Sequence, residues 1–432
     1  MKIKLAFGHS GLPVEFCDQR VDLIEPCFLD GLADETEAVR HALVHPIASA
    51  PLREIAPGTD SVAIIFSDRT RPMPSDRVLP AILSELDQVP RERITLINAL
   101  GTHRPNTPQE LEAMLGRNIL ANYRVVQHNP QDRNSMIYLG KSRFGNEVRV
   151  NREFFQAKVK ILTGFIEPHF FAGFSGGPKS VLLGVAAFDS ILRNHSASMI
   201  DNPNSTWGIL EGNPIQEEMR EVAELVKPDF LVNVTLNKDR AITGVFAGDW
   251  KAAHAAGCAF IKESVMRPVE KPYDVVVTTN SGFPLDLNLY QTVKGISAAA
   301  RIVKEGGAIV VASECSDGVP EHGNFRELLR ARKSPQELLE MIRSFKETVH
   351  DQWQVQILAK ILMKSRVYLF STLGAEEVRA AHLIPTRDIS IALRQLLDEW
   401  GRRRDRRDCD EFRVAVMPEG PQTVPYFLGT AG

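Results

Sequence analysis

Residues 159–180 of this 432-residue chain read VKILTGFIEPHFFAGFSGGPKS. The first part, Val159 to Phe165, is an apolar run with β-branched residues, which predicts a buried strand. The polar, aromatic and glycine-rich residues that follow predict a loop rather than a continued strand. A buried strand that leads directly into such a loop is typical of the edge where open α/β sheets bind their ligands.

The same pattern recurs along the chain. Further apolar, β-rich runs alternate with segments of helical periodicity, and they lie at Ser61 to Phe66, Ile94 to Leu100, Phe230 to Leu236, Asp274 to Thr278, Ala308 to Ala312 and Arg366 to Ser371. This alternation predicts an α/β fold with mainly parallel, doubly wound sheets. Two helix starts are explicit, because Thr107-Pro108 with Glu110 and Ser334-Pro335 with Glu337 each combine a cap, a proline and a capping-box glutamate.

The chain is longer than one hydrophobic core usually supports, so we expect two domains. The segment Met266 to Pro272 contains two prolines and mixed charge, and it is the candidate linker. We therefore expect an N-terminal α/β domain over residues 1–268 and a C-terminal α/β domain over residues 272–405. The stretch Phe412 to Met417 alternates like a strand, and we expect the tail, residues 410–432, to complete the N-terminal domain.

Composition excludes several classes of protein. The chain has 51 basic and 54 acidic residues, a formal charge of only -3, so nothing indicates a nucleic-acid binder. The five cysteines are scattered and never spaced as CxxC, which argues against a disulfide framework and a thiolate zinc site. The N-terminus lacks the apolar core of a signal peptide, and no run approaches a membrane span. We expect a cytoplasmic protein that does not associate with membranes.

Two predicted strands lead into polar loops with chemical potential. The first loop, FSDRTRP, contains Asp68, Thr70 and Arg71, and a guanidinium there can bind a substrate carboxylate through two hydrogen bonds. A surface turn with an Asp–Arg ion pair is the alternative explanation. The second loop, ALGTHRP, presents His103, and an imidazole exchanges protons near neutral pH, as a general base must.

The glycine-rich loop quoted first is the densest motif. It carries Glu167, His169 and Lys179, and its backbone can approach an anion closely because glycine has no side chain. Pro178 near a helix start leaves backbone N–H groups for a phosphate, although the spacing does not match a P-loop. We infer a phosphate-bearing cofactor, with a glycine-rich packing turn as the alternative. The cofactor-binding candidates are Gly176, Gly177, Lys179 and Ser180, and Lys179 is also a possible covalent anchor.

Two further motifs lie downstream. In RNHSAS, His195 follows Lys179 by sixteen residues, and a helix cap or core residue is the alternative to a metal ligand. In LYQTVKG, Gln291 and Lys294 share one face if the segment is helical, and with Tyr290 they can contact a hydroxy or carboxylate group. The remaining histidines are expected to be structural or surface residues: His9, His41, His45, His128, His254, His322, His350 and His382.

Taken together, DRTRP, GTHR, EPHFFAGFSGGPKS, RNHS and YQTVKG resemble the lactate racemase family in content and order, over roughly residues 60 to 300. The resemblance implies two α/β domains with the active site in the cleft between them. It also implies a nickel-pincer nucleotide, in which a pyridinium mononucleotide carries nickel between sulfur, carbon and sulfur atoms. Proteins that synthesise this cofactor would then be partners in maturation.

The resemblance assigns roles residue by residue. His103 and His169 correspond to the paired acid/base histidines, His195 to the nickel ligand, and Lys179 to the lysine that can tether the cofactor. Substrate contacts are implied for a further set of residues: Asp68, Arg71, Tyr290, Gln291, Lys294 and, in DQWQVQ, Trp353.

The implied reaction inverts C2 of a 2-hydroxy acid. Removal of the α-proton would leave a carbanion beside a carboxylate, so the cofactor instead accepts the α-hydride and a 2-keto acid results. Return of the hydride to the other face gives the opposite configuration, and a reversible enzyme needs a base on each side. The open alternatives are epimerisation of a larger 2-hydroxy acid (gluconate, malate or an aryl lactate), a non-catalytic nickel-nucleotide-binding protein and, with least support, a zinc hydrolase, because no HExxH motif occurs.

Overall fold

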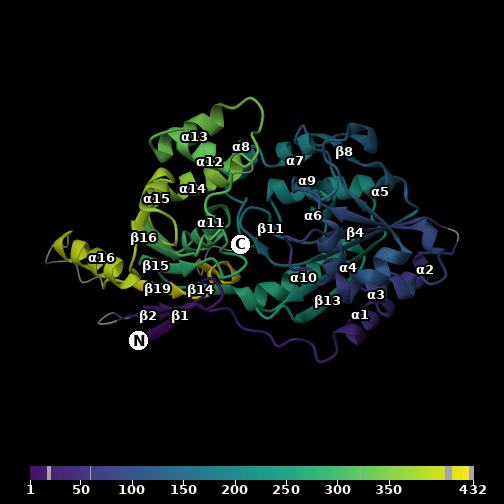
Figure 1. The fold of residues 1–432 in the computed structure, drawn as a ribbon, viewed down its shortest axis with the longest axis horizontal. Coiled ribbons are helices and arrows are strands. Elements are labelled where there is room, and N and C mark those ends of the chain that lie inside the picture. Colours follow the sequence, from purple (N-terminus) through teal and green to yellow (C-terminus); the bar gives the residue numbers. More distant parts are fainter. Residues whose placement is uncertain (17–20, 59, 322, 404–410, 428–432) are drawn as a thin grey trace. The chain divides into compact units, whose positions relative to one another are not determined.

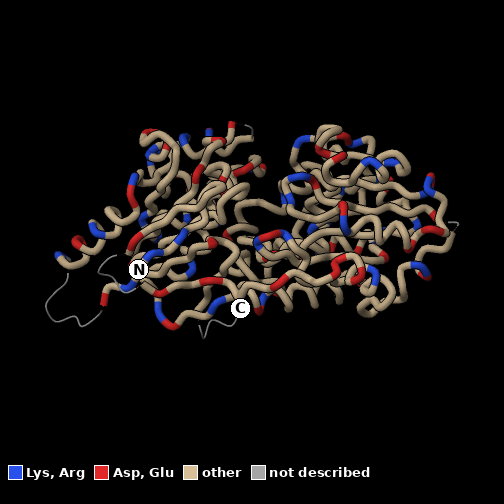
Figure 2. Tube along the Cα trace, turned by 60° about the horizontal axis from the view of Figure 1, so that its bottom comes forward, with Lys and Arg blue, Asp and Glu red and all other residues tan. Residues whose placement is uncertain are grey.

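The computed structural model describes residues 1–16, 21–58, 60–321, 323–403 and 411–427 (Figure 1). The chain forms two compact units, which we describe separately. The first consists of residues 28–195 and 202–264, and the second of residues 1–27, 196–201 and 265–432. Acidic and basic residues are interspersed along both units (Figure 2). No helix of the described part is long and apolar enough to cross a membrane.

The unit of residues 28–195 and 202–264 is built on a six-stranded sheet of order β13-β12-β9-β4-β5-β6. All neighbouring pairs are parallel except β12 with β13. The strands are β4 (Val62–Ser67), β5 (Ile94–Ala99), β6 (Arg124–Gln127), β9 (Val159–Phe165), β12 (Phe230–Leu236) and β13 (Ile242–Gly248). The four runs that the sequence predicts in this region are thus strands, within a residue or two.

One face of this sheet is covered by a hydrophobic core that includes α1 (Glu35–Val44), α3 (Ser75–Glu85) and α4 (Pro108–Asn122). Helix α4 begins with the predicted capping box: Thr107 Oγ1 accepts from the Glu110 amide, and the Glu110 carboxylate accepts from the Thr107 amide. The remaining elements are α2 (Leu52–Ile55), β7 (Met136–Lys141), β8 (Glu147–Asn151), α5 (Arg152–Gln156), β10 (Pro168–His169), β11 (Gly173–Phe174), α6 (Lys179–Leu182), α7 (Phe188–Asn194), α9 (Pro214–Val226) and α10 (Trp250–Val265).

The other unit contains a second six-stranded sheet, of order β18-β17-β16-β15-β19-β3, in which every neighbouring pair is parallel. Its strands are β3 (Val21–Leu23), β15 (Tyr273–Thr279), β16 (Val303–Ala312), β17 (Arg366–Phe370), β18 (Ile384–Thr386) and β19 (Val414–Met417). Its other elements are β1 (Lys2–Leu5), β2 (Leu12–Glu15), α8 (Ala197–Asp201), β14 (Met266–Val269), α11 (Leu289–Ala299), α12 (Phe325–Arg330), α13 (Pro335–Ser344), α14 (Gln352–Lys364), α15 (Ala375–Ala380), α16 (Ile389–Arg403) and β20 (Val424–Phe427).

The expected domain boundaries need correction at both ends of the chain. The described part of the tail does not complete the N-terminal domain, because β19 lies between β15 and β3 in the second sheet and β20 pairs with β14. Residues 1–27 belong to the same unit, although we expected them in the domain of residues 1–268. All four residues of β19 are buried, so this strand needs neighbours on both edges and cover on both faces. The predicted linker is also partly a strand, β14.

Candidate active site

The polar loops of the first unit follow three strands that are neighbours in its sheet. Strand β4 lies between β5 and β9 in parallel register, so the carboxyl ends of all three meet at one edge. The chain proceeds from β4 to β5 on one side and from β9 to β12 on the other. Such a reversal of direction is the switch point at which open α/β sheets bind ligands.

Asp68 and His103, from the loops after β4 and β5, form a close pair. The distance between Asp68 Oδ2 and His103 Nδ1 is 2.7 Å. The other carboxylate oxygen, Asp68 Oδ1, accepts from the amide of Thr70 at 2.6 Å. Asp68 is 4% exposed, whereas the side chain of His103 is 40% exposed. The buried carboxylate therefore fixes the orientation of the imidazole, while the rest of the ring remains accessible to solvent.

The electrostatics of this pair fix the proton on His103. Burial alone would raise the pKa of Asp68, but the hydrogen bond and charge of His103, with help from Arg71 and Thr70, lower that pKa to about 2. Asp68 is therefore ionised at neutral pH and can only accept hydrogen bonds. His103 Nδ1 must then be the donor, which leaves Nε2 as the nitrogen that accepts a proton.

Arg71 is half-buried in the same loop, and its backbone amide donates to the carbonyl of Asp68 at 3.1 Å. Its guanidinium has no hydrogen-bond or ion-pair partner among the residues that the structure describes. The neighbouring Arg69, by contrast, is paired with Glu110. The direct ion pair between Asp68 and Arg71 that we considered as the alternative is thus absent among the described residues, although the charge of Arg71 still helps to lower the pKa of Asp68. A planar, half-buried guanidinium of this kind suits a substrate carboxylate.

His169 has a different environment from His103. It lies in the short hairpin of β10 and β11 and is buried, and its Nδ1 accepts from the amide of Ala172 at 3.3 Å. A neutral His169 therefore carries its proton on Nε2. The ring of Phe171 contacts both His169, with centroids 4.5 Å apart, and His195, with centroids 4.9 Å apart. Phe171 was not among the site residues that we predicted from the sequence.

The glycine-rich loop is held from within the unit. The Gly177 amide donates to Asn233 Oδ1 at 2.8 Å. Both Gly176 and Gly177 have positive φ, and a Cβ on Gly177 would lie 2.5 Å from Cγ of His254. His254 Nε2 in turn contacts the Ser175 carbonyl oxygen at 2.9 Å. His254 thus has a structural role, which is to support this glycine-rich loop. The sequence contained a sign of the role of Asn233, because it is a polar residue within the otherwise apolar run FLVNVTL.

The expected phosphate site at a helix start needs correction. Helix α6 has only four residues, and the amides of Lys179, Ser180 and Val181 donate to the carbonyls of Gly176, Gly177 and Pro178. Ser180 Oγ also donates to the Gly177 carbonyl at 2.8 Å. The tight turn at the two glycines brings these carbonyl oxygens close enough to accept hydrogen bonds from the three amides. Those amides, which we had expected to bind a phosphate, are therefore not available for it. Lys179 and Ser180 remain half-buried candidates through their side chains.

His195 caps the carboxyl end of α7 and is 6% exposed. Its Nδ1 lies 3.1 Å from Oδ1 of Asn194. No group of three or more His, Cys, Asp or Glu side chains in the described part of the chain is placed to hold a metal ion alone. A metal that arrives with three donor atoms of its own would need one protein ligand, and a buried imidazole is a suitable one.

The remaining candidates lie on two helices of the other unit. Tyr290, Gln291 and Lys294 are in α11, which begins where Asn288 accepts from the Gln291 amide. Gln291 and Lys294 are half-buried, and the residues between them, Thr292 and Val293, are buried, so the predicted shared face exists. Trp353, in α14, is buried, and its Nε1 donates to the hydroxyl oxygen of Tyr290 at 3.1 Å.

Comparison with known proteins gives a consistent result. Residues 7–208 match the family model of the lactate racemase N-terminal domain, and residues 269–423 match that of the lactate racemase C-terminal domain. The lactate racemase of Thermoanaerobacterium thermosaccharolyticum is 36% identical over 91% of this chain and 93% of its own. That of Lactiplantibacillus plantarum is 38% identical over 89% of this chain and 90% of its own.

Solved structures agree with these relatives. The structure of the lactate racemase apoprotein from T. thermosaccharolyticum superposes with a TM-score of 0.91 at 33% identity, and the match covers 98% of this chain and 100% of the other. A Thermotoga maritima protein has a TM-score of 0.66 at 17% identity, covering 91% of this chain and 98% of its own, which shows a shared fold.

Proposed function

This chain belongs to the lactate racemase family and is an enzyme of the isomerase class, and we propose on that premise that it inverts C2 of a 2-hydroxy acid with a nickel-pincer nucleotide as cofactor. The observation that carries the proposal is the pairing of His103 with the ionised Asp68 beside the unpaired guanidinium of Arg71. A proton acceptor and a carboxylate-binding cation within one loop cluster suit a substrate that carries a hydroxyl next to a carboxylate.

The residues of the first unit fit such a cofactor. His195 offers one imidazole ligand, Lys179 offers an amine for a covalent tether, and the positive-φ glycines bring backbone close to the same region of the sheet edge. When bound, the cofactor supplies a reversible acceptor for the hydride on substrate C2, so that no carbanion need form beside the carboxylate.

His103 and His169 then have complementary starting states. With its proton on Nδ1 facing Asp68, His103 accepts the hydroxyl proton at Nε2, and the carboxylate stabilises the resulting imidazolium. With Nδ1 engaged by the Ala172 amide, neutral His169 carries its proton on Nε2 and can donate a hydrogen bond to the substrate oxygen; it acts as a general acid only after it has gained a second proton. The two histidines exchange these roles when the opposite enantiomer reacts.

The proposal extends to residues of the other unit, to maturation and to location. Tyr290, Gln291, Lys294 and Trp353 are assigned to substrate contacts, with the Trp353–Tyr290 hydrogen bond fixing the tyrosine hydroxyl. Loading with the cofactor requires the proteins that synthesise it. We assign the enzyme to the cytoplasm, where scattered cysteines remain reduced; those described, Cys27, Cys258 and Cys315, form no disulfide.

Chiral chromatography on single enantiomers tests the proposal. The protein is co-expressed with the nickel-cofactor synthesis enzymes, its nickel content is measured by mass spectrometry, and lactate, malate, phenyllactate and gluconate are each supplied in one configuration. Inversion of any of them supports the proposal and names the substrate. Nickel-loaded protein that inverts none of them contradicts it and favours a nucleotide-binding protein, and zinc without nickel contradicts the cofactor.

Two variants of one loop show whether the guanidinium of Arg71 binds the substrate. Arg71→Met removes a charged partner of the carboxylate, so kcat/KM is expected to fall by about ten- to a hundredfold, the equivalent of roughly 1.5–3 kcal/mol. Arg69→Met is the matched control, because Arg69 lies two residues away and is paired with Glu110 on the surface. Equal effects of the two substitutions would contradict the assignment.

A further inference from the structure

Behind His195 lies a chain of buried polar side chains that the proposed function does not use. Asn194 is fully buried; its Oδ1 faces His195 Nδ1 at 3.1 Å, and its Nδ2 donates to Glu218 Oε2 at 2.8 Å and to the Ile215 carbonyl at 3.2 Å. Glu218 is also fully buried, and its other oxygen, Oε1, accepts from Ser142 Oγ at 2.6 Å. The series Ser142–Glu218–Asn194–His195 is therefore continuous.

This series determines which nitrogen of His195 carries the proton. Both partners of Asn194 Nδ2, the Glu218 carboxyl and the Ile215 carbonyl, present acceptors, so the amide nitrogen must face them. The amide oxygen must then face His195, and an oxygen can only accept. His195 Nδ1 is consequently the donor, and Nε2 is left with the lone pair that a metal ion requires.

Glu218 keeps this function in either protonation state. Burial raises the pKa of Glu218, and Ser142 and Asn194 act against that increase. When the carboxyl is protonated on Oε1, Oε2 still accepts from Asn194 Nδ2, and the Ile215 carbonyl accepts from the same nitrogen in either state. The orientation of the Asn194 amide does not depend on the charge of Glu218.

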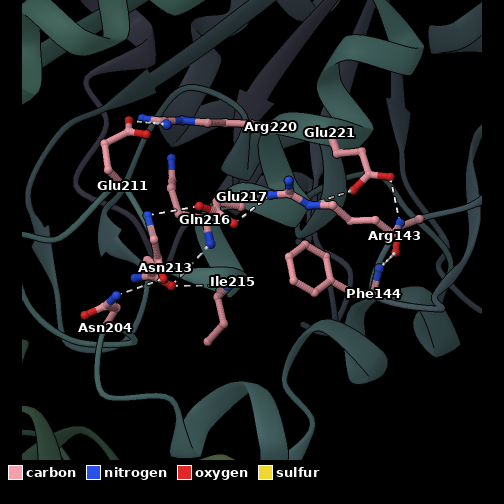
Figure 3. A network of polar contacts seen from close by, with 12 residues as sticks. Arg143, Phe144, Asn204, Glu211, Asn213, Ile215, Gln216, Glu217, Arg220 and Glu221 are labelled. Carbon is pink, nitrogen blue, oxygen red and sulfur yellow. Dashed lines mark hydrogen bonds and ion pairs between the residues drawn. The ribbon is translucent and has the colours of Figure 1, made fainter.

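Helix α9 carries Glu218, and its N-terminal cap is Asn213, so this helix positions both groups that act on His195. Asn213 caps this helix by accepting from the amides of Ile215 and Gln216 (Figure 3). Nδ2 of the same Asn213 donates to the carbonyl of Phe171 at 2.9 Å, and the ring of Phe171 packs edge-on against His195. One rigid helix thus orients His195 through two routes, the Glu218–Asn194 hydrogen bonds and the Phe171 ring.

We propose that Asn194 and Glu218 are positioning residues that hold His195 as the Nδ1–H tautomer, with Nε2 directed to the nickel of the cofactor. The role of His195 as metal ligand rests on the proposed function, whereas its tautomer does not. Partners of this kind commonly fix the ring orientation of a metal-binding histidine and raise its basicity.

The first test measures the tautomer in the protein without cofactor. Long-range proton–nitrogen correlation spectra of ¹⁵N-histidine-labelled protein distinguish the two tautomers, and His195→Gln identifies the resonance. We expect Nδ1–H in the wild type and loss of that preference in Asn194→Leu. Glu218→Gln keeps both acceptors for Asn194 Nδ2 and should preserve the tautomer, whereas Glu218→Leu leaves only the longer hydrogen bond to the Ile215 carbonyl and should weaken the preference for Nδ1–H. A wild-type His195 protonated on Nε2 would overturn the proposal without any variant.

The second test measures nickel retention by the loaded protein during dialysis against a chelator. Asn194→Leu and Glu218→Leu should lose nickel at least about tenfold faster than the wild type, and Glu218→Gln should not. Asn151→Leu is the matched control, since Asn151 is a buried asparagine of the same unit that caps α5 and does not touch His195. Unchanged nickel loss in both Leu variants overturns the inference; a wild type that never holds nickel overturns the proposed function and leaves the tautomer result standing.

Discussion

Replacement of Asp68 by Asn removes the charge that holds His103 and should change both stability and activity. The pKa of Asp68 is lowered from an ordinary 3.8 to about 2 in the folded protein. Each pKa unit corresponds to about 1.4 kcal/mol, so the ionised form stabilises the fold by roughly 2 kcal/mol. Asp68 is 4% exposed, and solvent screening of this contribution is therefore small.

The sign of the pH dependence follows from the direction of the shift. A carboxyl with a lowered folded-state pKa contributes its full stabilisation above about pH 4, and that stabilisation disappears as the pH falls toward 2. Urea denaturation of the wild type and Asp68→Asn should therefore show a difference in unfolding free energy of roughly 2 kcal/mol at pH 6 to 7. The difference should shrink progressively between pH 4 and 2.

Activity provides an independent readout of the same variant. An Asn side chain can face His103 Nδ1 with either its oxygen or its nitrogen, so the Nδ1–H tautomer is no longer enforced, and the imidazolium loses its counter-charge. We expect kcat to fall by on the order of a hundredfold or more, the usual contribution of a general base. A stability difference that does not change with pH, together with unchanged kcat, would refute the assignment of an ionised Asp68 bonded to His103.

Three further results are expected. His103→Ala and His169→Ala should each lower kcat by about 10²–10⁴ in both directions of inversion, because the base for one enantiomer is the acid for the other. Chiral chromatography that starts from each enantiomer measures this. Full activity of either variant in either direction would show that the replaced histidine is not part of the acid/base pair. Gly177→Ala places a Cβ 2.5 Å from the ring of His254 at a residue with positive φ, so it should destabilise the fold by roughly 2–4 kcal/mol. It should also reduce cofactor loading; denaturation and nickel content measure the two effects. A Gly177→Ala variant as stable as the wild type would show that the loop has room to shift. Thr107→Ala removes the cap of α4 and should cost about 1 kcal/mol of unfolding free energy while leaving the kinetics unchanged, which makes it a control for stability effects alone.

Local patterns in the sequence were sufficient for the main strands, for two helix starts and for the loops that hold the candidate residues. Apolar runs of strand length predict β9 and β12 to the residue, and the Thr107–Glu110 box predicts the start of α4. These features depend on side chains within a few residues of one another, so no tertiary information is needed. The same holds for the candidate residues that directly follow a strand, such as Asp68 and His103.

Only the tertiary structure decided how those pieces combine. The fully buried β19 joins the second sheet rather than the first, because that is where neighbours on both edges are available, and a local pattern does not state which sheet will supply them. The proton position on His103 likewise depends on Asp68, which lies 35 residues away in the sequence. That on His195 depends on the orientation of the neighbouring Asn194 amide, which the distant Glu218 helps to set. The sequence by itself determined which residues stand at the ends of strands, since strand formation is local. Strand order, burial and hydrogen-bond direction depend on contacts between distant segments, and these only the folded chain decided.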